Sequence, residues 1–190
     1  YHTTMSLETF ALTLDGAAFV WGAIWGSFLN VVIYRLPVGQ SLIRPASRCP
    51  KCQRPLPWHE HIPILGWLFV RGRCRGCGVS VSPRSPAVEL PTAVLSLWVW
   101  IHVAHGRLDL APEHFGESLL AVSMAFLFYF YFVAILIAIT FIDLDHTIIP
   151  HELTGAGLIL GVAAALLIPQ GGPFLDLWPG TDWVGCLLGI

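Results

Sequence analysis

The stretch that decides the fold is residues 141–150, which read Phe-Ile-Asp-Leu-Asp-His-Thr-Ile-Ile-Pro and end an apolar run that begins at Ser118. A helix over residues 118–142 is long enough to cross the roughly 30 Å hydrocarbon core of a bilayer. Ionisable side chains at the edge of such a span are costly, so Asp143 and Asp145 indicate a functional site. The proline behind them can end one helix and begin the next.

The composition of the whole chain agrees with a membrane location. Hydrophobic residues make up 55% and charged residues 12% of the 190 residues, and the mean hydropathy is +0.70. Soluble domains carry about 25% charged residues. Because lipid offers no partner to an open backbone, each long apolar run should be helical. We therefore expect an all-α polytopic membrane protein. It should have four complete transmembrane helices, over residues 16–34, 87–104, 118–142 and 153–168, and the start of a fifth near residue 182.

The positive charge is confined to one interval. Nine of the ten lysine and arginine residues lie between residues 35 and 86, where Glu60 is the only acid. The positive-inside rule predicts that this basic loop is cytoplasmic. The N-terminus is then outside, and Asp143 lies at the cytoplasmic end of the third span. Topology accounts for the charge, so no nucleic-acid partner is predicted. We divide the chain into residues 1–34 (N-terminal segment and first helix), 35–86 (basic loop) and 87–190 (helical core).

The basic loop contains two Cys-x-x-Cys pairs, Cys49 with Cys52 and Cys74 with Cys77. Two such pairs can present four thiolates to one tetrahedral ion, which is the geometry of structural zinc. A pair of disulfides is one alternative, which a reducing cytosol disfavours. A redox dithiol is another, which is disfavoured because nothing around the cysteines resembles a βαβ unit. His59 and His61 could also bind a metal, but four cysteines already complete the set. We predict a zinc-ribbon-like loop.

Asp143 and Asp145 cannot act as one facing pair, because on a helix they point about 200° apart. Asp143 follows Phe141 and Ile142 directly, so we expect it to lie deeper and to be the shielded carboxyl. An aspartic mechanism needs a second carboxylate nearby, so that one acts as base and the other as acid. Metal binding by Asp143, Asp145 and His146 remains open, as does a role as mere charges at the end of a span.

The first and second spans also carry polar and small residues. Gly22, Gly26, Ser27 and Asn30 recur at spacings near four, a pattern typical of close helix packing with Asn30 bonding across helices. Direct contact with a substrate is the alternative. Glu89, near the start of the second span, is either an interfacial anchor or part of a polar site.

Four motifs taken together resemble one known family. They are residues 26–37 (Gly-Ser-Phe-Leu-Asn-Val-Val-Ile-Tyr-Arg-Leu-Pro), the two cysteine pairs, residues 86–93 (Pro-Ala-Val-Glu-Leu-Pro-Thr-Ala) and residues 142–150. In this order they resemble the bacterial type IV prepilin leader peptidase/N-methyltransferases, aspartic membrane proteases of the Gly-x-Gly-Asp type. The resemblance covers roughly residues 16–160, and the combination is highly specific.

The resemblance implies an inner-membrane endopeptidase that removes the leader of type IV prepilins or type II secretion pseudopilins on the cytoplasmic side. Many members also methylate the new N-terminus with S-adenosylmethionine. In this family's motif Asp143 would be catalytic and Asp145 supporting. The spacing of Cys49, Cys52, Cys74 and Cys77 itself predicts the zinc ligands. The expected partners are the prepilin or pseudopilin substrate and the lipid bilayer. No residue here marks the methyl-donor site.

The chain departs from the family pattern in one respect. The family's second catalytic aspartate lies in a later Gly-x-Gly-Asp motif, which residues 1–190 lack. We expect that aspartate beyond Ile190 and expect the 190-residue chain alone to be inactive. A non-enzymatic scaffold with a zinc-binding docking loop is the alternative function, but it gives Asp143 no role. A metal transporter is disfavoured because residues 119–142 contain few polar side chains.

Overall fold

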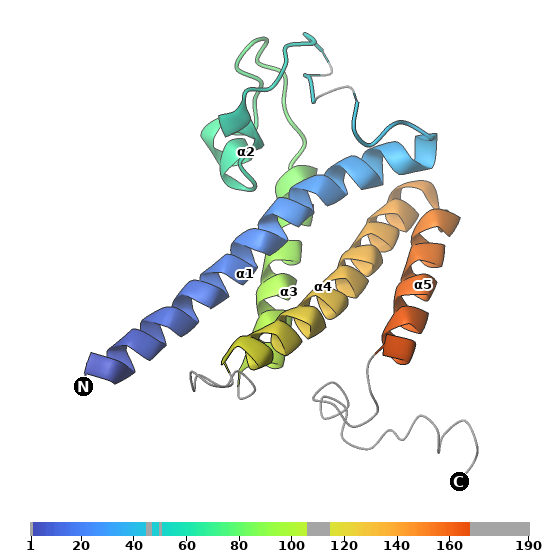
Figure 1. Cartoon of the computed structure of the whole chain (residues 1–190). Coiled ribbons are helices and arrows are strands. Elements are labelled where there is room, and N and C mark those ends of the chain that lie inside the picture. Colours follow the sequence, from blue (N-terminus) through green and yellow to red (C-terminus); the bar gives the residue numbers. More distant parts are fainter. Residues whose placement is uncertain (1, 45–46, 50, 106–114, 168–190) are drawn as a thin grey trace.

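Five helices and a compact loop make up the described part of the protein. The structure is a computed structural model that describes residues 2–44, 47–49, 51–105 and 115–167. Its long helices are α1 (His2–Arg35), α3 (Arg84–Ala104), α4 (Phe115–His146) and α5 (His151–Leu167). The short 3-10 turn η1 (Leu36–Val38) follows α1, and the loop before α3 holds η2 (Trp58–His61) and α2 (Leu65–Phe69). The long helices lie side by side, with the loop at one end of the bundle (Figure 1).

Helices α1 and α3 cross at very short range because two glycines remove the side chains that would separate them. A Cβ atom at Gly22 would lie 2.4 Å from Ser96 Cβ, and one at Gly26 would lie 2.7 Å from Glu89 Cα. Near the same crossing, the Ser96 hydroxyl donates a 2.7 Å hydrogen bond to the carbonyl of Ala18. The small-residue pattern of the first span therefore serves close helix packing, as predicted.

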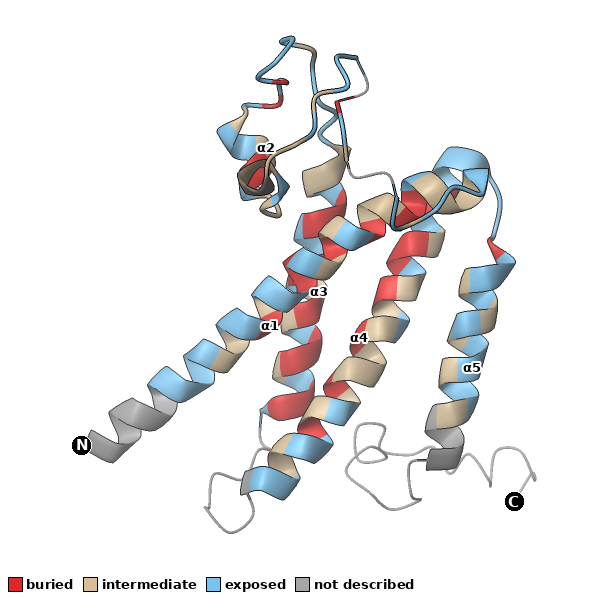
Figure 2. Ribbon diagram, turned by 45° about the horizontal axis from the view of Figure 1, so that its top comes forward, coloured by how far each residue is buried: buried red, intermediate tan, exposed pale blue. Residues whose placement is uncertain are grey.

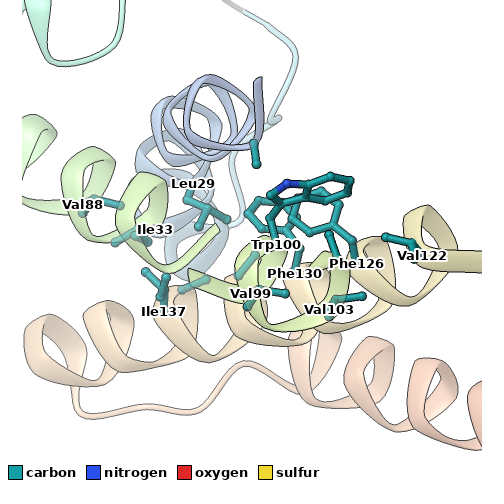
Figure 3. Close-up of a cluster of buried hydrophobic side chains, with 14 of the residues drawn as sticks. Leu29, Ile33, Val88, Val99, Trp100, Val103, Val122, Phe126, Phe130 and Ile137 are labelled. Carbon is teal, nitrogen blue, oxygen red and sulfur yellow. The ribbon is translucent and has the colours of Figure 1, made fainter. Parts of the chain in front are cut away.

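The buried side chains form a stripe along α3 and the facing sides of α1 and α4 (Figure 2). Phe130 of α4 and Ile33 of α1 are almost completely buried. Trp100 of α3 meets Phe126 of α4 edge to face at 5.4 Å between ring centroids. Figure 3 shows this cluster, in which Leu29, Ile33, Val88, Val99 and Trp100 approach Phe126, Phe130 and Ile137. The cluster holds α4, and with it residues 141–150, against α3.

The all-α fold is confirmed for the described residues, which contain no strand and only two isolated bridges. Three helices are long and apolar enough to cross a membrane, over Thr9–Val38, Arg84–Ala104 and Gly116–His146. They coincide with the first three predicted spans, although α1 begins before residue 16. The fourth predicted span coincides with α5, which has 17 residues, somewhat fewer than the roughly 20 that a span needs. The expected fifth helix lies outside the described residues, so the number of spans stays a prediction.

We predict that Gly22→Ala destabilises the helix pair whereas Gly16→Ala does not. A methyl group at position 22 collides with backbone and Cβ atoms of α3, and such overpacking costs about 1–3 kcal/mol. At Gly16 nothing lies within 4 Å of the added methyl, so this variant should gain up to about 1 kcal/mol from helix propensity. The measurement is the melting temperature of each detergent-purified variant. Equal melting temperatures would contradict the close contact.

Candidate functional site

The four loop cysteines converge on one point, as predicted. Their sulfur atoms all lie within 4.8 Å of one another. The Cys49 and Cys77 sulfurs are 3.8 Å apart, and those of Cys52 and Cys74 are 3.9 Å apart. Four thiolates held tetrahedrally about 2.3 Å from one ion would lie about 3.8 Å from each other. The sulfur positions therefore fit a tetrahedral metal site.

Both cysteine pairs sit in the same kind of turn. The N–H of Gln53 donates to the carbonyl of Cys49, and the N–H of Gly78 donates to the carbonyl of Cys74. Gln53 and Gly78 both have positive φ, at 57° and 69°, a conformation that glycine adopts freely and other residues rarely. An isolated bridge closes each turn, from Arg48 to Pro55 and from Arg73 to Ser80. The two turns thus present their thiols in matching fashion.

Backbone N–H groups in these turns stabilise two of the thiolates. The N–H groups of Gly76 and Cys77 lower the pKa of the Cys74 thiol to about 6. Those of Cys52 and Lys51 lower the pKa of Cys49. Cys49 and Cys74 are the buried members of their pairs, whereas Cys52 and Cys77 are exposed. Because the thiolate is the form that binds metal, these N–H groups prepare Cys49 and Cys74 as ligands.

The structure gives less support to disulfide bonds in the loop and to metal ligands other than the four cysteines. All four cysteines are free thiols, and their sulfurs are far beyond the roughly 2.05 Å of a disulfide bond. Among the described residues they are the one group of three or more Cys, His, Asp or Glu side chains whose ligand atoms meet. His59 and His61 are not in that group. Neither do Asp143, Asp145 and His146 form such a group.

The acid motif lies at the C-terminal end of α4. The helix continues through Asp143 and Asp145 and ends at His146. Thr147 then adopts a positive φ of 51°, and its N–H donates to the Asp143 carbonyl. After Pro150, α5 begins at once, so the proline separates two helices as predicted. The chain therefore turns sharply just behind the two acids.

The expectation that Asp143 is shielded is wrong in this structure. Ile142 takes the buried position of this turn, and Asp143, one step around the helix, is exposed. Asp145 instead has a defined partner, because its carboxylate accepts a hydrogen bond from the Arg84 guanidinium at the start of α3. The side chains of Arg84 and Asp145 are 37% and 33% exposed, so the pair lies at the rim of the bundle. It ties the acid motif to the end of the cysteine loop.

A second polar group lies between the loop and the bundle, around Glu89 of α3. Its carboxylate accepts a 2.6 Å hydrogen bond from the backbone N–H of Ile64 and one of 3.4 Å from the Asn30 amide. Asn30 also donates to the carbonyl of Ser85 at 3.2 Å. Glu89 is only 6% exposed. Of the two roles that its position allowed, membership of a polar site is therefore the one observed, and Asn30 bonds across helices as predicted.

A cavity of about 720 Å³ lies between these groups. Helix α1 contributes Asn30 and Tyr34 to its wall, α3 contributes Glu89, and the loop contributes Arg54 and Cys74. Opposite charges also meet in the loop, where Arg54 donates to the Glu60 carboxylate at 2.7 Å. The cavity thus lies between the cysteine loop and the polar ends of the first two spans.

Two connections of the site were missed from the sequence. Arg84 was counted only as part of the positive loop, yet it binds Asp145. The one signal of a role for Arg84 was its position two residues before the motif at residues 86–93. The hydrogen bond from Ile64 to Glu89 is donated by a backbone N–H. Every residue except proline carries this group, so the residue type could not indicate the bond.

Comparisons with known proteins agree with these features. Residues 20–103 match the family model of the bacterial peptidase A24 N-terminal domain. A prepilin leader peptidase/N-methyltransferase of Myxococcus xanthus (strain DK1622) is 44% identical over 77% of this chain and 39% of its own length. The enzyme of the same name from Aeromonas hydrophila is 36% identical over 90% of this chain and 59% of its length.

A third relative carries a different name. It is the type 4 prepilin-like proteins leader peptide-processing enzyme of Escherichia coli O78:H11 (strain H10407 / ETEC), 38% identical over 78% of this chain and 55% of its own length. The chain thus spans between 39% and 59% of the length of these three relatives. No solved structure matches it. The cysteine loop, the acid motif and these similarities together show that the chain belongs to the prepilin leader peptidase/N-methyltransferase family and carries that family's bacterial N-terminal domain.

Proposed function

We propose that the full-length protein is a membrane aspartic endopeptidase that removes the leader peptide of type IV prepilins or type II secretion pseudopilins. The single observation that carries the proposal is the acid motif at the end of an apolar helix, in a chain whose relatives are named for this reaction. In the proposal Asp143 is catalytic and Asp145 supports it. A scaffold function would leave both acids without a role, and the relatives are named as enzymes.

The exposure of Asp143 is compatible with this role. A carboxylate that acts on a peptide bond must be reachable by the substrate, and Asp143 lies on the open side of α4 while Asp145 is held by Arg84. In an aspartic mechanism two carboxyl groups share a proton, so that one activates water while the other protonates the leaving nitrogen. The second carboxyl group is proposed to come from beyond Ile190.

The cysteine loop is proposed to hold a structural zinc ion through Cys49, Cys52, Cys74 and Cys77. Zinc at such a site contributes folding free energy to a segment too small to be stable alone. The names of the relatives also support methylation of the newly exposed N-terminus, with S-adenosylmethionine as methyl donor. The positive charge of residues 35–86 supports a cytoplasmic location for this loop and an external location for the N-terminus. The membrane that the protein spans is proposed to be the inner membrane. We also propose that the chain divides into an N-terminal segment with the first helix (residues 1–34), the basic loop (residues 35–86) and the helical core (residues 87–190).

The peptidase proposal predicts that Asp143→Asn abolishes cleavage of a model prepilin by the full-length protein in membranes. Loss of a catalytic acid or base should lower the rate at least about a hundredfold. Glu117→Gln is the matched control, because Glu117 lies at the other end of the same helix. The measurement is the rate of leader release at equal membrane levels of each variant. Normal cleavage by Asp143→Asn would leave the scaffold as the better function.

The contact between Arg84 and Asp145 predicts that Arg84→Gln and Asp145→Asn act as one unit. Each single substitution removes the same ion pair, so each should lower kcat/KM by about two- to tenfold. The kcat/KM of the double variant should then be no lower than that of the less active single variant. The measurement is leader release by the four members of this double-mutant cycle. Independent, multiplicative losses would show that the pair does not support the acid motif.

The zinc proposal predicts one equivalent of zinc per chain in the purified wild-type protein and almost none in Cys74→Ser. Loss of the ion should also expose the loop to trypsin, since metal binding and folding are coupled. Cys186→Ser is the control, because Cys186 is the one cysteine outside the two Cys-x-x-Cys pairs. Elemental analysis gives the metal content. An unchanged zinc content in Cys74→Ser would exclude the site.

A further inference from the structure

Helix α2 turns apolar side chains away from the protein. Leu65, Leu68 and Phe69 are 47%, 53% and 58% exposed. The opposite side of α2 is fixed, because the Trp67 indole N–H donates to the carbonyl of Val81 and a Cβ atom at Gly66 would lie 2.4 Å from the Glu60 carbonyl oxygen. The exposed side chains therefore cannot turn inward without breaking these contacts.

The start of α2 is held at the level of the membrane-spanning helices. The backbone N–H of Ile64 donates to the Glu89 carboxylate. Glu89 lies five residues inside α3, which starts at Arg84, a rise of about 7.5 Å along the helix axis. At the same level, Glu89 packs against Gly26 of α1, more than two turns before that helix ends at Arg35. Both views of the fold place α2 beside the first turns of α3 (Figures 1 and 2).

The backbone is strained at the turn that leads into α2. Ile64 has a φ of 63° and a ψ of −55°, a combination that is unfavourable for a β-branched residue. Such strain persists only where surrounding contacts impose it. The turn is closed locally by the Leu65 N–H, which donates to the Pro63 carbonyl. The bond from the Ile64 N–H to the buried Glu89 carboxylate attaches this turn, and with it the start of α2, to α3.

The charges next to α2 suit a lipid surface. Arg71, Arg73 and Arg75 follow the helix closely, and residues 62–83 contain no acid. Apolar side chains next to cations are the pattern of segments that lie in the lipid–water interface, where the cations meet anionic headgroups. A soluble loop would instead leave three large apolar side chains in water.

We propose that α2 lies in the lipid–water interface of the leaflet on the side of the cysteine loop, with Leu65, Leu68 and Phe69 in contact with lipid. The loop is then attached to the bilayer at its middle as well as at its two ends. This attachment fixes the height of the cysteine site above the membrane. The proposal rests on the membrane-spanning helices and not on the peptidase activity.

The test is photocross-linking of the full-length protein in phospholipid vesicles that contain phosphatidylglycerol. p-Benzoyl-phenylalanine is placed at position 69, and lipid adducts are counted by mass spectrometry after irradiation. Position 136, which is 48% exposed on α4, is the lipid-facing control. Position 43, an isoleucine of the loop that is 86% exposed, is the control for an exposed apolar side chain outside α2. We expect adducts at position 69 to match those at 136 and to exceed those at 43 several-fold.

Two results would overturn the proposal. One is a lipid yield at position 69 no greater than at position 43. The other is cross-linking of position 69 to a second copy of the chain or to another protein, without lipid adducts. Position 68 provides a second probe in case the label at 69 disturbs folding, and an unchanged melting temperature shows that the labelled protein is intact. Position 136 reports the membrane insertion of α4 without reference to catalysis.

Discussion

The carboxylate of Glu89 joins three parts of the protein that are distant in sequence. It accepts hydrogen bonds from Ile64 in the loop and from Asn30 in α1, and it belongs to α3. A carboxylate that is almost fully buried has few other sources of compensation for lost water. Without these donors, the bond that attaches the start of α2 to α3 and the bond that joins α1 to α3 at the same level would both be lost.

Close packing of α1 on α3 is what brings Asn30 within reach of Glu89. In a membrane, helices gain nothing by hiding apolar surface from lipid, so association depends on surface fit and on hydrogen bonds between helices. Gly22 and Gly26 supply the fit, and Asn30 supplies the bond. The aromatic residues around Phe130 then hold α4 against the pair. The acid motif is thereby positioned by contacts that begin far from it.

Much of this arrangement could be predicted because it follows from residue type and spacing. Long apolar runs specify helices, four cysteines in two pairs specify a converging site, and a proline after the acids specifies a helix break. The exposure of Asp143 could not be predicted, because depth along a helix does not determine which side of the helix faces a neighbour, and Ile142 took the inner position. The partner of Asp145 depends on how α3 meets α4, which no local pattern encodes.

The matching turns of the two cysteine pairs have a consequence for assembly of the bundle. An ion bound to all four sulfurs would close the chain into a ring between residues 49 and 77. The ends of α1 and α3 would then be joined by a much shorter free tether than the whole loop provides. A shorter tether raises the effective concentration of two linked partners. The ion would thus favour the meeting of the first two spans after each has entered the lipid, in addition to any stability that it gives the loop itself.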